Sequence, residues 1–113
     1  MARGEDCCEN MKKALERCLK NMPDEEDVKG QAEFFKAISD PARVKIIYAL
    51  ANGDLCVCEL MDIMGMQQTV VSHHLKILKY AHIISDKKSG KWVNYSLVDR
   101  RALDALKAVK ESA

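Results

Sequence analysis

Apolar residues recur every three or four positions along most of this 113-residue chain. That spacing places them on one side of an α-helix, so the pattern predicts a mainly helical protein. Pro23 and the acidic run 24–27 interrupt the first apolar pattern, which predicts a linker over residues 23–29. The expected helices cover residues 8–22, 31–39, 41–51, 57–64, 67–80 and a last segment that starts near residue 99.

The third expected helix has clear local signals at both ends. Asp40 is a favourable N-cap residue, Pro41 suits the first helical position, and Asn52-Gly53 ends the segment. The same spacing predicts the buried sides of three helices. In chain order these are Ala32, Phe35 and Ile38; Val44, Ile47, Tyr48 and Ala51; and Val57, Leu60, Met61 and Met64.

The period of the pattern changes after residue 82. Residues 83–88 and 91–97 flank Ser89-Gly90, and the second run alternates as a strand does, which predicts a β-hairpin with a two-residue turn. A short helix, a glycine-containing turn, a longer helix and a basic hairpin occur in the order of a winged helix-turn-helix. We therefore expect a mainly α-helical winged helix-turn-helix fold with a small β-hairpin.

The helix expected over residues 67–80 has two different sides. Its apolar side carries Val70, Val71, His74, Leu75, Ile77 and Leu78, where we expect His74 to be packed and hydrogen-bonded. Alone, its polar side would most simply be a solvated surface, but its place between a turn and a basic hairpin favours double-stranded DNA. The residues predicted to contact bases or phosphates are Gln67, Gln68, Thr69, Ser72, His73, Lys76, Lys79, Lys87, Lys88 and Lys91.

The charge distribution supports this local interpretation. The whole chain has a net charge of only +1, but residues 67–91 contain five lysines and one aspartate. A local basic segment is what binding to phosphates requires. No apolar stretch approaches the roughly 20 residues needed to cross a bilayer, and the polar N-terminus does not resemble a signal peptide. We expect a cytoplasmic protein without a membrane partner.

The five cysteines, in a chain for which we expect no export signal, favour reduced thiols over disulfides. Cys56 and Cys58 would point in nearly opposite directions on a regular helix. Both can face one ion if Cys56 lies just before the helix and Cys58 lies in its first turn, where the positive end of the helix favours thiolates. Thiolates select soft ions such as Zn(II), Cd(II), Pb(II), Cu(I) and As(III). Cys18, on an apolar helix side, is expected to pack in the core or in a dimer interface.

The stretch DLCVCELMDIMGMQQTVVSHHLKIL, residues 54–78, resembles the helix-turn-helix of the ArsR/SmtB repressors. The arsenic, cadmium and lead sensors of that family carry a similar E-L-C-V-C-D-L box. FKAISDPARVKIIYAL (35–50) and GKWVNYSL (90–97) resemble the preceding helices and the wing of the family. The resemblance implies a homodimeric repressor that binds operator DNA when metal-free and releases it when a thiophilic ion binds.

With the helical pattern, the resemblance predicts three parts of the chain. Residues 1–30 are expected to form an N-terminal helix or arm for dimerisation and possible metal binding, and residues 31–98 the winged helix-turn-helix DNA-binding domain. Residues 99–113 are expected to form a C-terminal dimerisation helix.

Two thiolates make an incomplete metal site, so further ligands are needed. Arsenic sensors of the family carry a third cysteine shortly after the pair, where this chain has Leu60 and Met61. Cadmium- and lead-sensing relatives recruit cysteines from the N-terminal arm of the other subunit. The predicted metal ligands are therefore Cys56 and Cys58 with Cys7 and Cys8, and which of Cys7, Cys8 and Cys18 completes the site stays open. Four thiolates suit Cd(II) or Zn(II), whereas three suit Pb(II) or As(III).

Two other functions stay open at this point. The same DNA-binding domain could respond to oxidation of its thiols instead of to a metal. A small metal carrier or thiol oxidoreductase would also use a cysteine pair, but it would leave the polar helix side and the basic hairpin unexplained. The C-x-C spacing also differs from the C-x-x-C of thioredoxin-like proteins. No glycine-rich phosphate loop or Ser/His/Asp arrangement suggests an enzyme.

Overall fold

The computed structural model describes the backbone of residues 5–112 and the side chains of residues 9–110. The chain divides into two compact units, one up to Gln31 and one from Ala32 onward. The first unit contains α1 (Glu5–Asn21) and the first part of α2 (Glu25–Ile38). The second unit contains the rest of α2 and all later helices and strands. Within the described residues, no helix combines the length and the apolar character needed to cross a membrane.

The predicted linker over residues 23–29 is wrong, because α2 already begins at Glu25. The Asp24 carboxylate accepts a hydrogen bond from the backbone N–H of Asp27 at 2.9 Å, as an N-cap residue does. Glu25, Glu26 and Asp27 form the first turn, where negative side chains interact favourably with the positive end of the helix. The acidic run is therefore a helix start rather than a solvated connection.

In the second unit, α3 (Pro41–Leu50) starts as predicted. Asp40 has an extended backbone, and its Oδ2 accepts hydrogen bonds from the backbone N–H groups of Ala42 at 2.9 Å and Arg43 at 3.3 Å. These bonds satisfy donors that the first turn of a helix leaves without a helical partner. The start of α3 is consequently fixed by one carboxylate.

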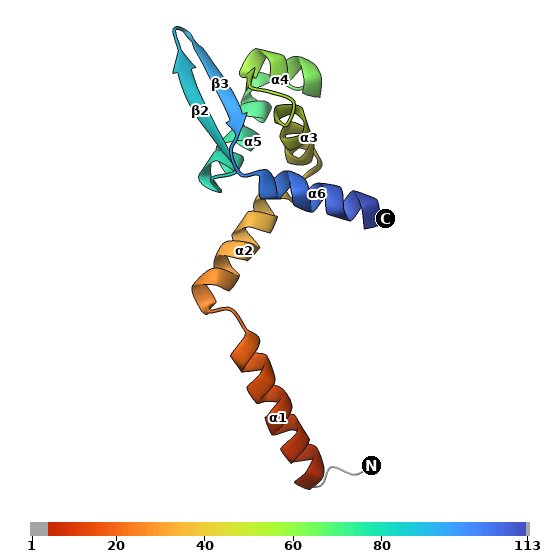
Figure 1. Ribbon diagram of the computed structural model, residues 1–113. Coiled ribbons are helices and arrows are strands. Elements are labelled where there is room, and N and C mark those ends of the chain that lie inside the picture. The colour runs from red at the N-terminus through yellow and green to blue at the C-terminus, as the bar shows by residue number, and fades with distance from the viewer. Residues whose placement is uncertain (1–4, 113) are drawn as a thin grey trace. The chain divides into compact units, whose positions relative to one another are not determined.

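The helix-turn-helix consists of α4 (Val57–Met64) and α5 (Gln68–Tyr80), both close to their predicted bounds (Figure 1). Gly65 ends α4 in the left-handed conformation, with a φ of +63°, and its N–H donates to the carbonyl of Met61. Glycine is favoured there because it has no Cβ to clash with the backbone. The turn therefore has the chemistry that stops one helix and lets the next begin.

A three-stranded antiparallel sheet completes the second unit, with the strand order β1-β3-β2. β2 (Ile84–Ser89) and β3 (Trp92–Leu97) form the predicted hairpin, here called the wing, which projects from the helices (Figure 1). The third strand is β1 (Leu55–Cys56), immediately before α4, and it pairs with β3. The sequence pattern does not reveal β1, since two residues are too few to show a strand period.

The turn of the wing lies one residue later than predicted. Ser89 pairs with Trp92, so the two-residue turn is Gly90-Lys91 and not Ser89-Gly90. Gly90 has a φ of +62°, which suits a tight hairpin turn that glycine accommodates without strain. Lys91 is consequently a residue of the turn itself.

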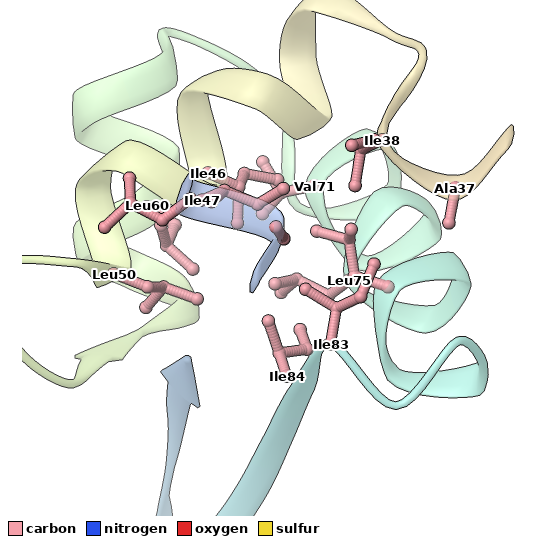
Figure 2. Close-up of a cluster of buried hydrophobic side chains, with 13 residues drawn as sticks. Ala37, Ile38, Ile46, Ile47, Leu50, Leu60, Val71, Leu75, Ile83 and Ile84 are labelled. Carbon is pink, nitrogen blue, oxygen red and sulfur yellow. The ribbon is translucent and has the colours of Figure 1, made fainter. Parts of the chain in front are cut away.

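One hydrophobic core joins the helices of the second unit to the base of the wing (Figure 2). The last helix, α6 (Arg100–Ser112), contributes Ala102 and Leu103 to this core. The other buried members are Ala37, Ile38, Ile46, Ile47, Leu50, Leu60, Val71, Leu75, Leu78, Ile83 and Ile84. Since α5 is held by three buried side chains on one side, its other side is left to solvent.

Some predicted buried positions are wrong, although the helices that carry them are present. Ile38 is buried as predicted, but Phe35 is 55% exposed and Ala32 is also exposed, because α2 packs through Phe34 and Ala37 beside Ile38. That set has helical spacing as well, so only contact with the core distinguishes the two. Val70 of α5 is 42% exposed, since it lies at the margin of the buried side. In α3 the fully buried residues include Ile46 and Leu50, which the predicted side omits.

Candidate DNA interface and thiol site

α5 presents its predicted polar side to solvent. Val71 and Leu75 point from the opposite side into the core (Figure 2), which holds the helix in place. A B-DNA major groove is wide enough to admit one α-helix. The exposed residues at the start and on the polar side of α5 are Gln67, Gln68, Thr69, Ser72, His73, Lys76 and Lys79. Their exposure is as expected, and their contact with DNA stays a prediction.

Lys79 is a predicted contact residue that already forms an ion pair within the described part of the chain. Its Nζ donates a hydrogen bond to Oδ2 of Asp86 on β2 at 2.9 Å, and this bond raises the pKa of the Lys79 ammonium. The ion pair joins the last turn of α5 to the wing. Asp86, which the sequence analysis did not single out, therefore helps to set the relation between the two basic elements.

An open hollow of about 590 Å³ lies beside this ion pair, between α5 and β2. Two lysines and one aspartate line it, which gives it the positive character that attracts phosphate. The lining residues are Lys76, Lys79, Tyr80, His82, Ile84, Ser85 and Asp86. The basic surface of α5 thus continues toward the base of the wing.

The wing carries the three other predicted lysines, all exposed. Lys87 and Lys88 are consecutive residues of β2, so their side chains leave opposite faces of the sheet. Lys91 lies in the turn, with its Nζ 5.8 Å from the ring centre of Trp92 in a cation–π arrangement. Positive charge is therefore present on both faces and at the tip of the wing.

Cys56 and Cys58 lie at the start of α4, at the positions along the chain that the sequence predicts, and their binding of a shared ion stays a prediction. Cys56 is the N-cap residue of α4, with an extended backbone, and Cys58 is the second residue of the helix. Cys56 is half-buried and Cys58 is exposed. The Glu59 carboxylate accepts a hydrogen bond from the Cys56 backbone N–H at 3.1 Å, and this bond, with one from the Cys56 side chain, lowers the pKa of Glu59. Glu59 thereby fixes the backbone that carries the first thiol.

The pairing of β1 with β3 connects the thiol pair to the wing. Cys56 lies opposite Asn94 on β3, and Asn94 lies opposite Lys87 on β2. Directly opposite residues of antiparallel strands share a face of the sheet, so Cys56, Asn94 and Lys87 form one row across it. The sequence pattern gives no signal for the role of Asn94, because its neighbours come from two other strands.

The described side chains include no group of three histidine, cysteine, aspartate or glutamate residues placed to hold a metal ion. Cys56 and Cys58 thus offer two thiolates, and a complete site needs further ligands. Cys7 and Cys8 belong to α1, but their side chains lie outside the described residues. Cys18 is exposed on α1, so the expectation that it packs in the core is wrong. Its expected place in a dimer interface stays a prediction.

Comparison with known proteins identifies the family of this chain. Residues 40–86, from the N-cap of α3 into β2, match the family described as "Bacterial regulatory protein, arsR family". An HTH-type transcriptional regulator of Methanocaldococcus jannaschii is 46% identical over 81 residues, which cover 71% of this chain and 91% of that relative. The chain belongs to the arsR family.

Other similarities of this arsR-family chain are to a cadmium resistance regulator and to a solved structure. A cadmium resistance transcriptional regulatory protein CadC homolog of Staphylococcus aureus is 48% identical over 69 residues, or 60% of this chain and 57% of that relative. The chain thus spans little more than half the length of that protein. The homodimeric winged helix-turn-helix DNA-binding domain of a possible ArsR-family regulator from Mycobacterium bovis matches with a TM-score of 0.70, at 21% identity, over 81% of this chain and 87% of the other. That likeness shows the winged helix-turn-helix fold.

The matched segment of this arsR-family chain contains the thiol pair, the whole helix-turn-helix and the first residues of β2, whereas α1 and α6 lie outside it. It also contains Arg43, a residue that the sequence analysis did not single out. Arg43 Nη1 lies 3.2 Å from Nδ1 of His74, whose side chain is only 13% exposed. The prediction that His74 is packed and hydrogen-bonded is confirmed.

Proposed function

We propose that this arsR-family protein is a homodimeric transcriptional repressor that binds double-stranded operator DNA and releases it when a thiophilic ion binds Cys56 and Cys58. The observation that carries the proposal is the position of the thiol pair, where β1 meets the first turn of α4. An ion that draws the two thiols together acts on the helix-turn-helix and, through β1, on the wing.

DNA binding is supported by the exposed polar side of α5 and by the lysines of the wing. Gln67 and Gln68 stand at the start of α5, where a recognition helix meets base edges, and a glutamine amide suits adenine in the major groove. Lys87, Lys88 and Lys91 suit phosphate oxygens on the flanking backbone.

Dimerisation is supported by apolar surface on α1. Met11, Leu15 and Leu19 of α1 are all more than half exposed and recur at helical spacing, and Met22, just after the helix, is exposed as well. Such a stripe is costly in water, and a second copy of the chain can cover it with the same stripe. A symmetric dimer would present two copies of α5 to successive major grooves of a palindromic operator.

Thiolate chemistry supports Cd(II), Pb(II), Zn(II) or As(III) as the inducing ion, because soft ligands select soft ions. The name of the Staphylococcus aureus relative, a cadmium resistance regulator, agrees with that choice. We assign the missing ligands to cysteines in the N-terminal arm of the other subunit, with Cys7 and Cys8 preferred over Cys18. Four thiolates would form the tetrahedral site that Cd(II) and Zn(II) favour.

The coupling between ion and DNA needs only a modest energy. A ligand that distinguishes two conformations by about 1–3 kcal/mol changes affinity about 5- to 150-fold. The row of Cys56, Asn94 and Lys87 offers one route for that difference, since a shift of β1 moves β3 and then β2. The N-cap position of Cys56 offers the other route, through the orientation of α4.

A DNA-binding assay tests the proposal. The metal-free protein first selects a duplex from random sequences, and fluorescence anisotropy then measures its Kd for that duplex with and without Cd(II), Pb(II), Zn(II) and As(III). We expect at least one ion to raise the Kd about 5- to 150-fold. Cys56→Ser and Cys58→Ser should bind the duplex but lose this response, and Mg(II), a hard ion, should have no effect. A Cys58→Ser variant that responds as fully as the wild type would refute the thiol site.

Further measurements separate the alternatives. Serine variants of Cys7, Cys8 and Cys18, followed by thiolate-to-metal absorbance, identify which α1 cysteine binds the ion. Treatment of metal-free protein with hydrogen peroxide tests whether oxidation of the exposed Cys58 thiol releases DNA. DNA release that needs no metal and is reversed by reductant would support a redox switch instead.

A further inference from the structure

Three polar side chains join α5 to the start of α3. Arg43 Nη1 lies 3.2 Å from Nδ1 of His74, in the middle of α5, and Asp40 Oδ2 lies 3.9 Å from the same nitrogen. Arg43 Nε also donates a hydrogen bond to the carbonyl of Ala37, near the end of α2, at 2.6 Å. Because the imidazole is largely buried, these contacts bear directly on how α5 sits against α2 and α3.

The arginine determines the protonation state in which this contact exists. A guanidinium has only donors and stays charged, so it requires a lone pair on Nδ1 of His74. The contact therefore belongs to the neutral imidazole that carries its proton on Nε2. A second proton, on Nδ1, would remove the acceptor and place two cations next to each other.

Asp40 provides an alternative partner for a protonated imidazole. Burial acts to raise the pKa of the Asp40 carboxyl, but hydrogen bonds from the backbone N–H groups of Arg43 and Ala42, with the charge of Arg43, hold the pKa below its ordinary value. The carboxylate is thus ionised and already caps α3. An imidazolium that moves toward Asp40 leaves Arg43 and competes for that cap.

Other charged and titratable groups of α2 and α5 lie near this cluster. The ring centre of His73, the preceding residue of α5, lies 5.6 Å from that of His74. Arg43 also lines a hollow of about 330 Å³ together with Glu33 and Lys36 of α2 and Tyr80 of α5. Among these groups, Arg43 is the one within hydrogen-bonding distance of His74 Nδ1.

We propose that Arg43 and His74 form a proton-sensitive clip that holds α5 in its DNA-binding position while the imidazole is neutral and releases it when the imidazole is protonated. The proposal rests on the proposed function in that α5 is the helix that contacts DNA, but it does not involve the thiols. Arg43 is a positioning residue, since it acts on DNA binding through His74. Protonation of His74 should weaken DNA binding, whereas protonation of an exposed histidine at a DNA interface would strengthen it, so the direction of the change distinguishes the two.

The first test needs no substitution. Nitrogen-15 NMR of the imidazole rings in the wild-type protein distinguishes the two neutral tautomers from each other and from the protonated ring. We expect His74 to carry its proton on Nε2, with Nδ1 acting as acceptor. A proton on Nδ1 would overturn the clip, whatever the protein does with DNA.

The second test uses the fact that the chain has three histidines. The double variant His73→Gln/His82→Gln keeps His74 as its one histidine. Its Kd for the selected duplex is measured at two pH values, a higher one at which nitrogen-15 NMR shows a neutral His74 ring and a lower one at which it shows a protonated ring. We expect the Kd to rise on the order of tenfold at the lower pH, the effect of losing one hydrogen bond to a charged group.

The matched control adds His74→Asn, whose Oδ1 can accept from Arg43 in place of Nδ1 but does not titrate. This histidine-free protein should bind equally at both pH values. Adding Arg43→Met to the single-histidine protein should weaken binding at both pH values and abolish the pH dependence. Circular dichroism at each pH checks that all variants are folded.

The outcomes separate the two proposals. Equal affinity at both pH values in the single-histidine protein overturns the clip and leaves the proposed function intact. A pH dependence that persists with Arg43→Met also overturns the clip. If the wild-type protein selects no duplex at about pH 8, the proposed function fails, and the role of the clip in DNA binding fails with it.

Discussion

Replacing Asp86 with asparagine separates two roles of Lys79. In the native protein the Lys79 ammonium is held 2.9 Å from Asp86 Oδ2, where α5 meets the wing, so its charge is already paired. Asparagine keeps the size of the side chain and one oxygen acceptor but removes the negative charge. Asp86→Asn is therefore expected to free Lys79 for a DNA phosphate and to make the surface between α5 and the wing more positive.

The expected magnitude follows from counterion release. Each phosphate that a protein cation neutralises on duplex DNA steepens the fall of log affinity with log salt by about 0.9. One freed Lys79 per subunit should steepen the slope by about that amount per subunit, with tighter binding at low salt and convergence toward the wild type at high salt. Both side chains of the ion pair are partly exposed, so its loss should change the stability of the fold little.

Anisotropy titrations over a series of KCl concentrations measure this slope. Asp104→Asn is the matched control, because Asp104 is an exposed aspartate on α6 and its loss changes the net charge equally. Asp86→Asn combined with Lys79→Met should return the slope to the wild-type value. The reasoning is refuted if Asp86→Asn leaves the slope unchanged, or if Asp104→Asn steepens it to the same extent.

Two further predictions concern stability. Leu60 is completely buried, so Leu60→Ala should lower the free energy of unfolding in urea by about 2–5 kcal/mol, whereas the exposed Ile63→Ala should change it little; equal losses would contradict the assigned core. A side-chain hydrogen bond from Arg101 lowers the pKa of Asp99 below its ordinary 3.8, so this carboxylate stabilises the fold above that pH and ceases to do so as the pH falls through the folded value. The wild type should therefore be more stable than Asp99→Asn at neutral pH and should lose that advantage in acid. A difference between their urea midpoints that stays the same at both pH values would contradict this prediction.

Local chemistry accounts for the features that the sequence predicts well. The start of α3 depends on Asp40 and Pro41, which act on the next few residues only. The two sides of α5 follow from the helical period, and the expected place of Cys56 just before α4 agrees with its N-cap position. The contacts predicted for DNA and for an ion depend on molecules beyond the chain, so they stay predictions.

Features that depend on distant residues have weak signals in the sequence. β1 exists because Leu55 and Cys56 find partners on β3, and two residues carry no period of their own. Arg43 and His74 are 31 positions apart, and neither residue type indicates the other. Phe35 shows that a helical period alone does not decide which residues are buried. The set with Phe35 and the set with Phe34 both fit the period of α2, and contact with the core buries the set with Phe34.

Packing and polar contacts have different effects on α5. Val71, Leu75 and Leu78 are fully buried, so their close packing holds α5 on the core and restricts its crossing angle. The contacts of His74 with Arg43 and of Lys79 with Asp86 are directional as well, and they depend on the charge of the groups that make them. Removing a core side chain costs a large share of the about 5–15 kcal/mol that stabilises a small domain. Losing one polar contact costs less, so an orientation-based switch on α5 belongs in its polar contacts.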